Sequence, residues 1–350
     1  MTSNVKRSVV CLVLLFGMLS MTTLAANKNR IGTSGAQELL IPVGARGVAL
    51  GFSGSLFIKG VDAIYWNPAG LSRMENAVEV MFSQMSYIAD IGISYGAIGV
   101  RVGDFGHLGF SIKSLSFGDI PVTTELYPDG TGTTYSPSFL TLGATYSRLL
   151  TDRISVGVNM YLVSEKILNV SASGMCFDIG VQYQNLGIQG LALSVAVKNI
   201  GPNMTYDGSG AYKVAAPQDG SIRGAATLKT EMASFEMPAN LEIGFGYSPK
   251  LDDKNTVNFG AAFRNNNYLE DEYNLGAEYS YMNTVFLRGG YSLSPQTDKD
   301  LTNAKGYIYD WTLGAGVHYL TGGVDLSFDY AYRNVKYFDG NHTLTLKVGF

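Results

Sequence analysis

Residues of the types that carry out catalysis or bind metals are few in this chain of 350 residues. Its three histidines are His107, His318 and His342, and none stands at a metal-ligand spacing from another or from Cys176. Ser111 follows His107 at an even offset, which is more often chance than a catalytic dyad. We expect neither a Gly-x-Ser-x-Gly nucleophile elbow nor a phosphate-binding loop. We therefore predict no enzyme, no metal site and no cofactor.

The elements that must position the remaining polar residues are strands. From Ala77 onward, apolar residues alternate with polar or small ones in segments of about ten residues, most clearly in 323–333. Such alternation over about 9–11 residues is typical of the tilted strands of a transmembrane β-barrel. We count fourteen segments, an even number, as in single-chain bacterial barrels: 77–87, 91–101, 105–117, 136–149, 153–165, 174–184, 190–200, 239–248, 255–265, 272–281, 284–293, 308–320, 323–333 and 342–350.

The connections between these segments give an independent check on the count. The connections after every second segment are short, from Val102–Asp104 to Thr321–Gly322. The other set contains the long stretches 118–135, 201–238 and 294–307. Periplasmic turns are short and extracellular loops are longer in such barrels. Because a count wrong by one strand would scramble this alternation, we expect an all-β, antiparallel transmembrane barrel of about 14 strands.

If the apolar face of each strand meets lipid, the other face lines the lumen. That face carries acidic and basic residues in nearly equal number, which favours ion pairs that brace the barrel or hold a plug over a selective ion pathway. We expect a lumenal network of Arg288, Asp310, Asp325, Asp329, Arg333 and Lys347, and the same face also carries Lys113, Glu165, Asp178, Lys198, Glu242, Arg264 and Glu278.

Composition and the two termini indicate the compartment. Charged residues are only 15%, and the net charge of −4 with a pI near 5.4 argues against a nucleic-acid partner. Lys6 and Arg7, an apolar run and a small-residue site at Ala25–Ala26 predict a secretory signal peptide over residues 1–26. The last strand ends in Phe350, which resembles the targeting signal read by outer-membrane assembly machinery. We expect a protein of the cell outer membrane, in contact with its lipid.

Residues 27–76 precede the barrel, residues 77–350, and follow a different pattern. They are rich in Gly and Ala, with polar anchors such as Arg46 and Asn67, and Asn67-Pro68 fits the start of a turn. We expect this segment to lie inside the lumen as a hatch, its small residues packed against lumenal glycines. The residues expected to anchor it are Gly44, Arg46, Gly47, Asp62, Trp66, Asn67 and Pro68.

The same segment carries a family resemblance. Gly44-Ala-Arg46-Gly47, followed by Asp62-Ala-Ile-Tyr-Trp66-Asn67-Pro68-Ala-Gly70-Leu71, resembles the N-terminal signature of the PorV/PorQ family, within the broader FadL-like barrels. The resemblance implies a role in type IX protein secretion and surface attachment, with secreted proteins or the secretion translocon as partners. Likeness to the FadL-like group implies an alternative, a channel for the uptake of hydrophobic small molecules.

Three functions therefore remain open: a secretion accessory, a channel for hydrophobic uptake, and a structural outer-membrane protein without a transported ligand. The loop 201–238 bears on the first two, because it mixes Met204, Tyr206 and Phe235 with polar residues. Such a mixture suits either a protein contact surface or a vestibule for an apolar ligand. A closed lumen braced by charges would count against uptake.

Overall fold

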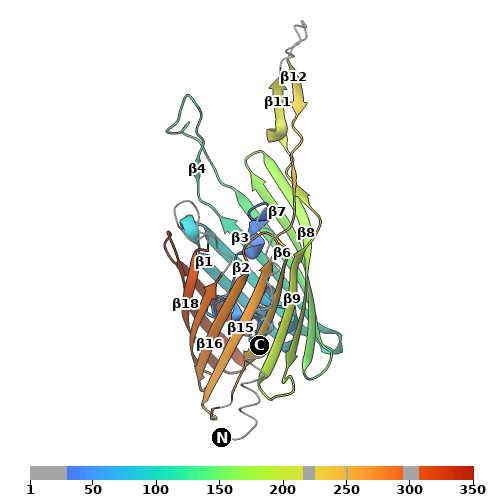
Figure 1. Cartoon of the computed structure of the whole chain (residues 1–350), viewed down its shortest axis with the longest axis vertical. Coiled ribbons are helices and arrows are strands. Elements are labelled where there is room, and N and C mark those ends of the chain that lie inside the picture. The colour runs from blue at the N-terminus through green and yellow to red at the C-terminus, as the bar shows by residue number, and fades with distance from the viewer. Residues whose placement is uncertain (1–29, 216–224, 250, 295–306) are drawn as a thin grey trace.

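The computed structural model describes residues 30–215, 225–249, 251–294 and 307–350. In this part of the chain fourteen antiparallel strands close into a barrel (Figure 1), and each overlaps one predicted segment, which confirms the predicted fold class. Their bounds are β1 (Val78–Ser86), β2 (Gly92–Val102), β3 (Gly106–Ser116), β6 (Ser138–Leu149), β7 (Ile154–Ile167), β8 (Val170–Gln184), β9 (Leu191–Ile200), β14 (Asn240–Tyr247), β15 (Asn255–Asn266), β16 (Glu272–Tyr281), β17 (Val285–Leu293), β18 (Tyr309–Thr321), β19 (Val324–Val335) and β20 (Asn341–Gly349).

The barrel closes between its first and last strands. β1 pairs with β20 in a register that places Phe82 opposite Leu346. The carbonyl oxygen of Phe350 also accepts hydrogen bonds from the backbone N–H groups of Ala77 and Val78, at 2.8 and 3.1 Å. Each barrel strand is therefore paired on both sides, so the wall presents no open sheet edge.

The two ends of the barrel differ, as the predicted alternation of connections requires. The short-turn end carries compact turns such as 322–323. The long-loop end carries 117–137 and the described parts of 201–239, namely 201–215 and 225–239, which hold small sheets of their own and project beyond the barrel (Figure 1). These sheets are β4 (Ile120–Pro121) with β5 (Thr134–Tyr135), β10 (Met204–Thr205) with β13 (Ser234–Phe235), and β11 (Tyr212–Ala215) with β12 (Ala226–Lys229).

Side chains on most of the wall divide as in a membrane barrel, with apolar residues outside and polar residues inside. On β19, for example, Phe328 and Tyr330 are exposed while Asp329 is buried. Asn159 and Glu278 are buried deep in the lumen. Among the described residues, no helix has the length and apolar character needed to cross a membrane.

The N-terminal segment forms short helices packed against the inward faces of the strands (Figure 1). Small and apolar side chains such as Ala45, Ile64 and Leu71 are completely buried there. The segment consists of η2 (Gln37–Leu40), α2 (Ala45–Ala49), η3 (Ser53–Leu56), η4 (Gly60–Asp62), α3 (Ala63–Trp66) and η5 (Pro68–Arg73). The expected signal peptide, 1–26, and parts of loops 201–238 and 294–307 lie outside the described residues.

Candidate functional site

Glycines on the barrel wall make room for the N-terminal segment. A Cβ at Gly180 would lie 2.0 Å from Oδ1 of Asn67, and one at Gly157 would lie 2.3 Å from the carbonyl carbon of Pro68. On another part of the wall, a Cβ at Gly314 would lie 2.5 Å from that of Ala49. Because these separations are shorter than any non-bonded contact allows, the two surfaces fit only with glycine at these positions.

Asn67 fixes the start of η5 and ties it to two strands. Its Oδ1 accepts a hydrogen bond from the Ala69 N–H at 3.0 Å, an N-cap arrangement, and Pro68 follows at the first helical position. Its Nδ2 donates to Ser194 Oγ at 2.8 Å and to the Val181 carbonyl oxygen at 3.2 Å. Asn67 is fully buried, so its hydrogen-bonding capacity is used to hold this helix against β8 and β9.

Trp66 lies within the N-terminal segment and contacts several of its other parts. Its Nε1 donates to the carbonyl oxygen of Val43 at 3.0 Å, and its ring meets Phe52 edge-on at 5.3 Å between centroids. A Cβ at Gly47 would lie 2.2 Å from the indole, so α2 approaches this ring only through a glycine. Gly44 has a φ of +82°, a conformation that glycine adopts without strain as the chain enters α2.

A chain of charges, formed by alternating basic and acidic side chains, joins the N-terminal segment to β16, β17 and β19. Arg46 donates to both carboxylate oxygens of Glu278, at 2.8 and 3.0 Å. Glu278 also accepts a hydrogen bond from Arg288 Nε at 2.6 Å. Arg288 in turn contacts Asp329, so the chain of charges runs from α2 through β16 and β17 to β19.

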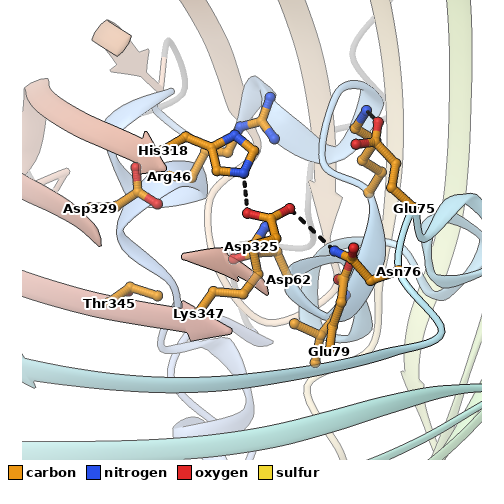
Figure 2. Close-up of polar contacts among 12 residues, drawn as sticks. Arg46, Asp62, Glu75, Asn76, Glu79, His318, Asp325, Asp329, Thr345 and Lys347 are labelled. Atoms are coloured by element: carbon orange, nitrogen blue, oxygen red, sulfur yellow. Dashed lines mark hydrogen bonds and ion pairs between the residues drawn. The ribbon is translucent and has the colours of Figure 1, made fainter. Parts of the chain in front are cut away.

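A second polar cluster lies beside this chain of charges (Figure 2). Lys347 donates to Oδ2 of Asp62 at 2.7 Å, which ties η4 to the last strand. Asp325 contacts Nε2 of His318 and accepts a hydrogen bond from Asn76 Nδ2 at 3.2 Å. The cluster therefore connects the end of the N-terminal segment to the last three strands of the barrel, beside the seam where β1 pairs with β20.

Glu79 makes a contact with the N-terminal segment that the alternation of apolar and polar residues did not predict. Its Oε2 accepts the Val61 N–H at 2.9 Å, so the start of β1 also holds η4. Its Oε1 accepts from Asn76 Nδ2 at 3.4 Å. Neither Asn76 nor Glu79 was expected at the site, since each lies beside the predicted boundary between the segment and the barrel.

Asp310 does not belong to the network in which we placed it. The pairing of β18 with β19 shifts register between Tyr309 and Thr312, and Asp310 pairs with Lys336 at 2.9 Å. Arg333 is buried, but it stacks on aromatic rings: its guanidinium lies 4.5 Å from the Phe52 ring centroid. Of the predicted network, the structure links Arg288 with Asp329, and it places Asp325 and Lys347 in the second cluster.

Two inward lysines bind the N-terminal segment through its backbone. Lys113 donates to the carbonyl oxygens of Glu38 and Ile41, at 2.5 and 2.6 Å. Lys198 donates to the carbonyl oxygen of Tyr65 at 2.6 Å. The alternation of apolar and polar residues predicts that both lysines face the lumen. It does not predict their partners, because every residue has a backbone carbonyl oxygen and the sequence does not indicate which one accepts.

The letters Gly-x-Ser-x-Gly do occur, at Gly92–Gly96, against the expectation from sequence. A nucleophile elbow needs its serine on a sharp turn between a strand and a helix. Ser94 instead lies inside β2, where its Oγ donates to Oε1 of Gln84 at 2.8 Å. The match therefore carries no catalytic arrangement.

Two cavities within the described part of the barrel bear on whether it could pass a ligand. The large one, about 550 Å³, is lined by charged residues such as Arg46, Glu278 and Asp325. The small one, about 20 Å³, is lined by Tyr95, Lys113 and other largely polar residues, and has room for about one water molecule. Neither of these two cavities is an apolar passage.

The described parts of loop 201–238 comprise a buried base and an exposed hairpin, β11–β12. Met204 and Met237 are buried in one cluster with Leu39 of the N-terminal segment, and Tyr206 and Phe235 pack on the same cluster. By contrast, the β11–β12 hairpin leaves Tyr212, Val214 and Leu228 between 51% and 75% exposed. The base therefore packs on the N-terminal segment, and the strands of the hairpin offer an exposed surface.

Comparison with known proteins gives a family and a fold. The family model described as type IX secretion system protein PorV matches residues 24–225. No curated protein matches the chain. Among solved structures, the Pseudomonas putida toluene transporter TodX is similar with a TM-score of 0.55 at 14% identity, covering 88% of this chain and 97% of that one.

Two further structures agree with it. A Pseudomonas aeruginosa FadL homologue has a TM-score of 0.53 at 12% identity, and the match covers 89% of this chain and 98% of that one. The CymD monoaromatic hydrocarbon channel has a TM-score of 0.51 at 15% identity with the same coverage. At these identities the similarities show the barrel fold alone, which agrees with the FadL-like resemblance.

Proposed function

This chain belongs to the PorV family, and from that premise we propose that it works in the outer membrane as an accessory of type IX protein secretion. In this role it binds secreted proteins or the secretion translocon. The proposal rests on a contrast between the lumen of the barrel and its exposed loops. The lumen is occupied and braced by charges, while the exposed apolar residues of the loops lie on hairpins that project beyond the barrel.

The projecting hairpins have the character of protein contact surfaces. On β11–β12, Val214 is 75% exposed, and Leu228 on the partner strand is also exposed. In the loop between β4 and β5, Leu126 is 86% exposed and Tyr127 is exposed beside it. Apolar side chains gathered on a protruding ribbon gain free energy when a partner covers them.

The lumen favours partner binding over transport. A channel for hydrophobic molecules needs an apolar passage, and the larger of the two described cavities is bordered by arginine, lysine, glutamate and aspartate side chains. The N-terminal segment is held in the barrel through buried contacts such as Asn67 to Ser194 and Arg46 to Glu278. Burying these polar groups in pairs is favourable only while the pairs stay together.

Hydrophobic uptake is the second candidate, because the similar solved structures include a toluene transporter and a monoaromatic hydrocarbon channel. For this chain to act in that way, the N-terminal segment would have to move. The two functions are separable by experiment, since the first depends on the outer hairpins and the second on the segment.

The test is deletion of the gene, with complementation by two variants. The hairpin variant carries Tyr212→Ser, Val214→Ser and Leu228→Ser. The control carries Leu168→Ser, at an exposed turn between β7 and β8. We expect deletion to deplete surface-attached secreted proteins, and the control but not the hairpin variant to restore them. An unchanged surface proteome in the deletion strain, together with lost growth on a hydrophobic carbon source, would favour uptake instead.

A further inference from the structure

The smaller of the two cavities lies where the N-terminal segment meets six consecutive strands. Leu39 on η2 and Tyr65 on α3 form one side of it, and residues of β2, β3, β6, β7, β8 and β9 form the rest. Its volume of about 20 Å³ is room for one water molecule or one ion of similar size. An occupant of this cavity therefore touches the N-terminal segment and the barrel wall at the same time.

Two buried lysines belong to the lining of the cavity. Lys113 and Lys198 are only 4% and 5% exposed, and their Nζ atoms lie 5.0 and 4.2 Å from the centre of the Tyr65 ring. Lys113 donates two N–H groups to backbone carbonyl oxygens, and Lys198 donates one, to Tyr65. Because an ammonium group has three N–H donors, one donor of Lys113 and two of Lys198 are left for other partners.

The lining of the cavity carries an excess of positive charge. Asp178 is the only acid among the lining residues, against the two lysines. Its Oδ1 accepts the Asn199 N–H at 2.8 Å, and its Oδ2 accepts Nδ2 of Asn159 at 3.0 Å. A buried charge without a counter-charge is strongly unfavourable. One of the two lysines therefore needs a further negative charge.

Acids outside the lining do not supply that charge. Glu242 acts on Lys198, but it is paired with Arg264 at 3.1 Å. Glu38 acts on Lys113, but burial, followed by the charge of Glu165, raises the pKa of Glu38 to about 8. Near neutral pH the carboxyl group of Glu38 is therefore protonated and uncharged. The excess of one positive charge remains at the cavity.

Two hydroxyl groups of the lining add donors that lack partners. Tyr95 and Thr141 are each 4% exposed, and neither hydroxyl oxygen has a hydrogen-bond partner among the described residues. Both groups can donate. A water molecule brings donors of its own and no net charge, whereas a halide ion only accepts and carries one negative charge. The donors and the charge of the cavity therefore favour a halide ion over water.

We propose that this cavity binds one halide ion, such as chloride, between the two lysines and the hydroxyl groups of Tyr95 and Thr141. The ion neutralises the excess positive charge and accepts the N–H and O–H donors that lack partners. Lys113 and Lys198 also hold the backbone of the N-terminal segment, at Ile41 and Tyr65. The ion therefore stabilises the seating of the segment in the barrel, and this role does not depend on the proposed secretion function.

The first test measures whether halide stabilises the protein. The full chain, purified in detergent, is unfolded in urea and refolded near neutral pH with sodium gluconate, sodium chloride or sodium bromide as the only salt, at equal ionic strength. We expect the melting temperature to rise with the concentration of chloride and of bromide and not with that of gluconate, because a ligand that binds the folded state stabilises it. Equal melting temperatures in the three salts would overturn the proposal.

Matched variants separate the cavity from a general effect of salt. Tyr95→Phe with Thr141→Val removes the two hydroxyl donors and keeps the shapes of the side chains. The control, Tyr307→Phe with Thr343→Val, removes two buried hydroxyl groups that also lack partners but do not line the cavity. The apparent dissociation constant for bromide should rise roughly tenfold in the first variant and stay unchanged in the control. The same bromide dependence in both variants and the wild type would contradict the site.

Bromide also reports its own position. Crystals of the wild type grown in sodium bromide and measured at the bromine absorption edge should show an anomalous peak in the cavity, beside Lys113 and Lys198. The peak should weaken in Tyr95→Phe with Thr141→Val and persist in the control variant. A cavity that contains water and gives no anomalous peak would overturn the proposal.

Discussion

Arg46 and Glu278 are 232 positions apart in the sequence, yet they form a two-point ion pair at 2.8 and 3.0 Å between α2 and β16. The Arg46 side chain is 16% exposed and the Glu278 side chain 1%, so the pair is shielded from most of the solvent screening that weakens surface ion pairs. It is therefore a direct charged link between the N-terminal segment and the wall of the barrel.

Replacing Arg46 with Met should destabilise the seating of the N-terminal segment. Removal of one partner leaves a buried charge uncompensated, which costs about 3–5 kcal/mol for an isolated pair and less here, because Glu278 keeps Arg288. Thermal unfolding of Arg46→Met, Glu278→Gln and the double variant measures the coupling, for which we expect roughly 1–3 kcal/mol. Additive effects of the two single changes would show that the pair contributes nothing of its own.

Gly180→Ala should disturb the fit between β8 and η5. The new methyl group would lie 2.0 Å from Oδ1 of Asn67, so the helix cap must shift, at a cost of about 1–3 kcal/mol typical of overpacking. Gly289→Ala is the matched control, since its methyl would lie 3.6 Å from a side-chain carbon of Leu313, an ordinary contact. Equal melting temperatures for the two variants in detergent would contradict the close fit assigned to Gly180.

Glu38 should make stability depend on pH. Burial, followed by the charge of Glu165, raises the pKa of Glu38 to about 8 from its ordinary 4.5. The folded state therefore holds this proton more tightly than the unfolded state. The stability that protonated Glu38 contributes is fully present below pH 4.5 and is lost as the pH rises through about 8.

Melting temperatures of the wild type and Glu38→Gln at about pH 5 and about pH 9 check this dependence. The wild type should lose more stability between the two conditions than Glu38→Gln, whose amide carries no proton to release. A loss of the same size in both proteins would assign the pH dependence to other groups.

Strand positions were predictable from the sequence because alternation is a local property. The partners of site residues were not, since Arg46 meets Glu278 only once β16, the tenth strand of the barrel, is in register. Asp310 was misassigned for a related reason, because a shift of register changes the face of the residues beyond it. Alternation also leaves open which face of a strand is outside, and on β1 the place of Met85 in the buried core answers that question.

Asn67→Ala should loosen the N-terminal segment without unfolding the barrel. The change removes the cap on Ala69 and leaves Ser194 and the Val181 carbonyl without their shared donor, at a cost of about 1–3 kcal/mol. Because the strands themselves remain paired, the effect should be leakage: higher single-channel conductance in planar bilayers and greater sensitivity of cells to large antibiotics. Asn169→Ala, at an exposed turn, is the control and should behave as wild type. Unchanged conductance and sensitivity in Asn67→Ala would mean that contacts elsewhere, such as the ion pairs of Arg46 and Lys347, hold the segment in place by themselves.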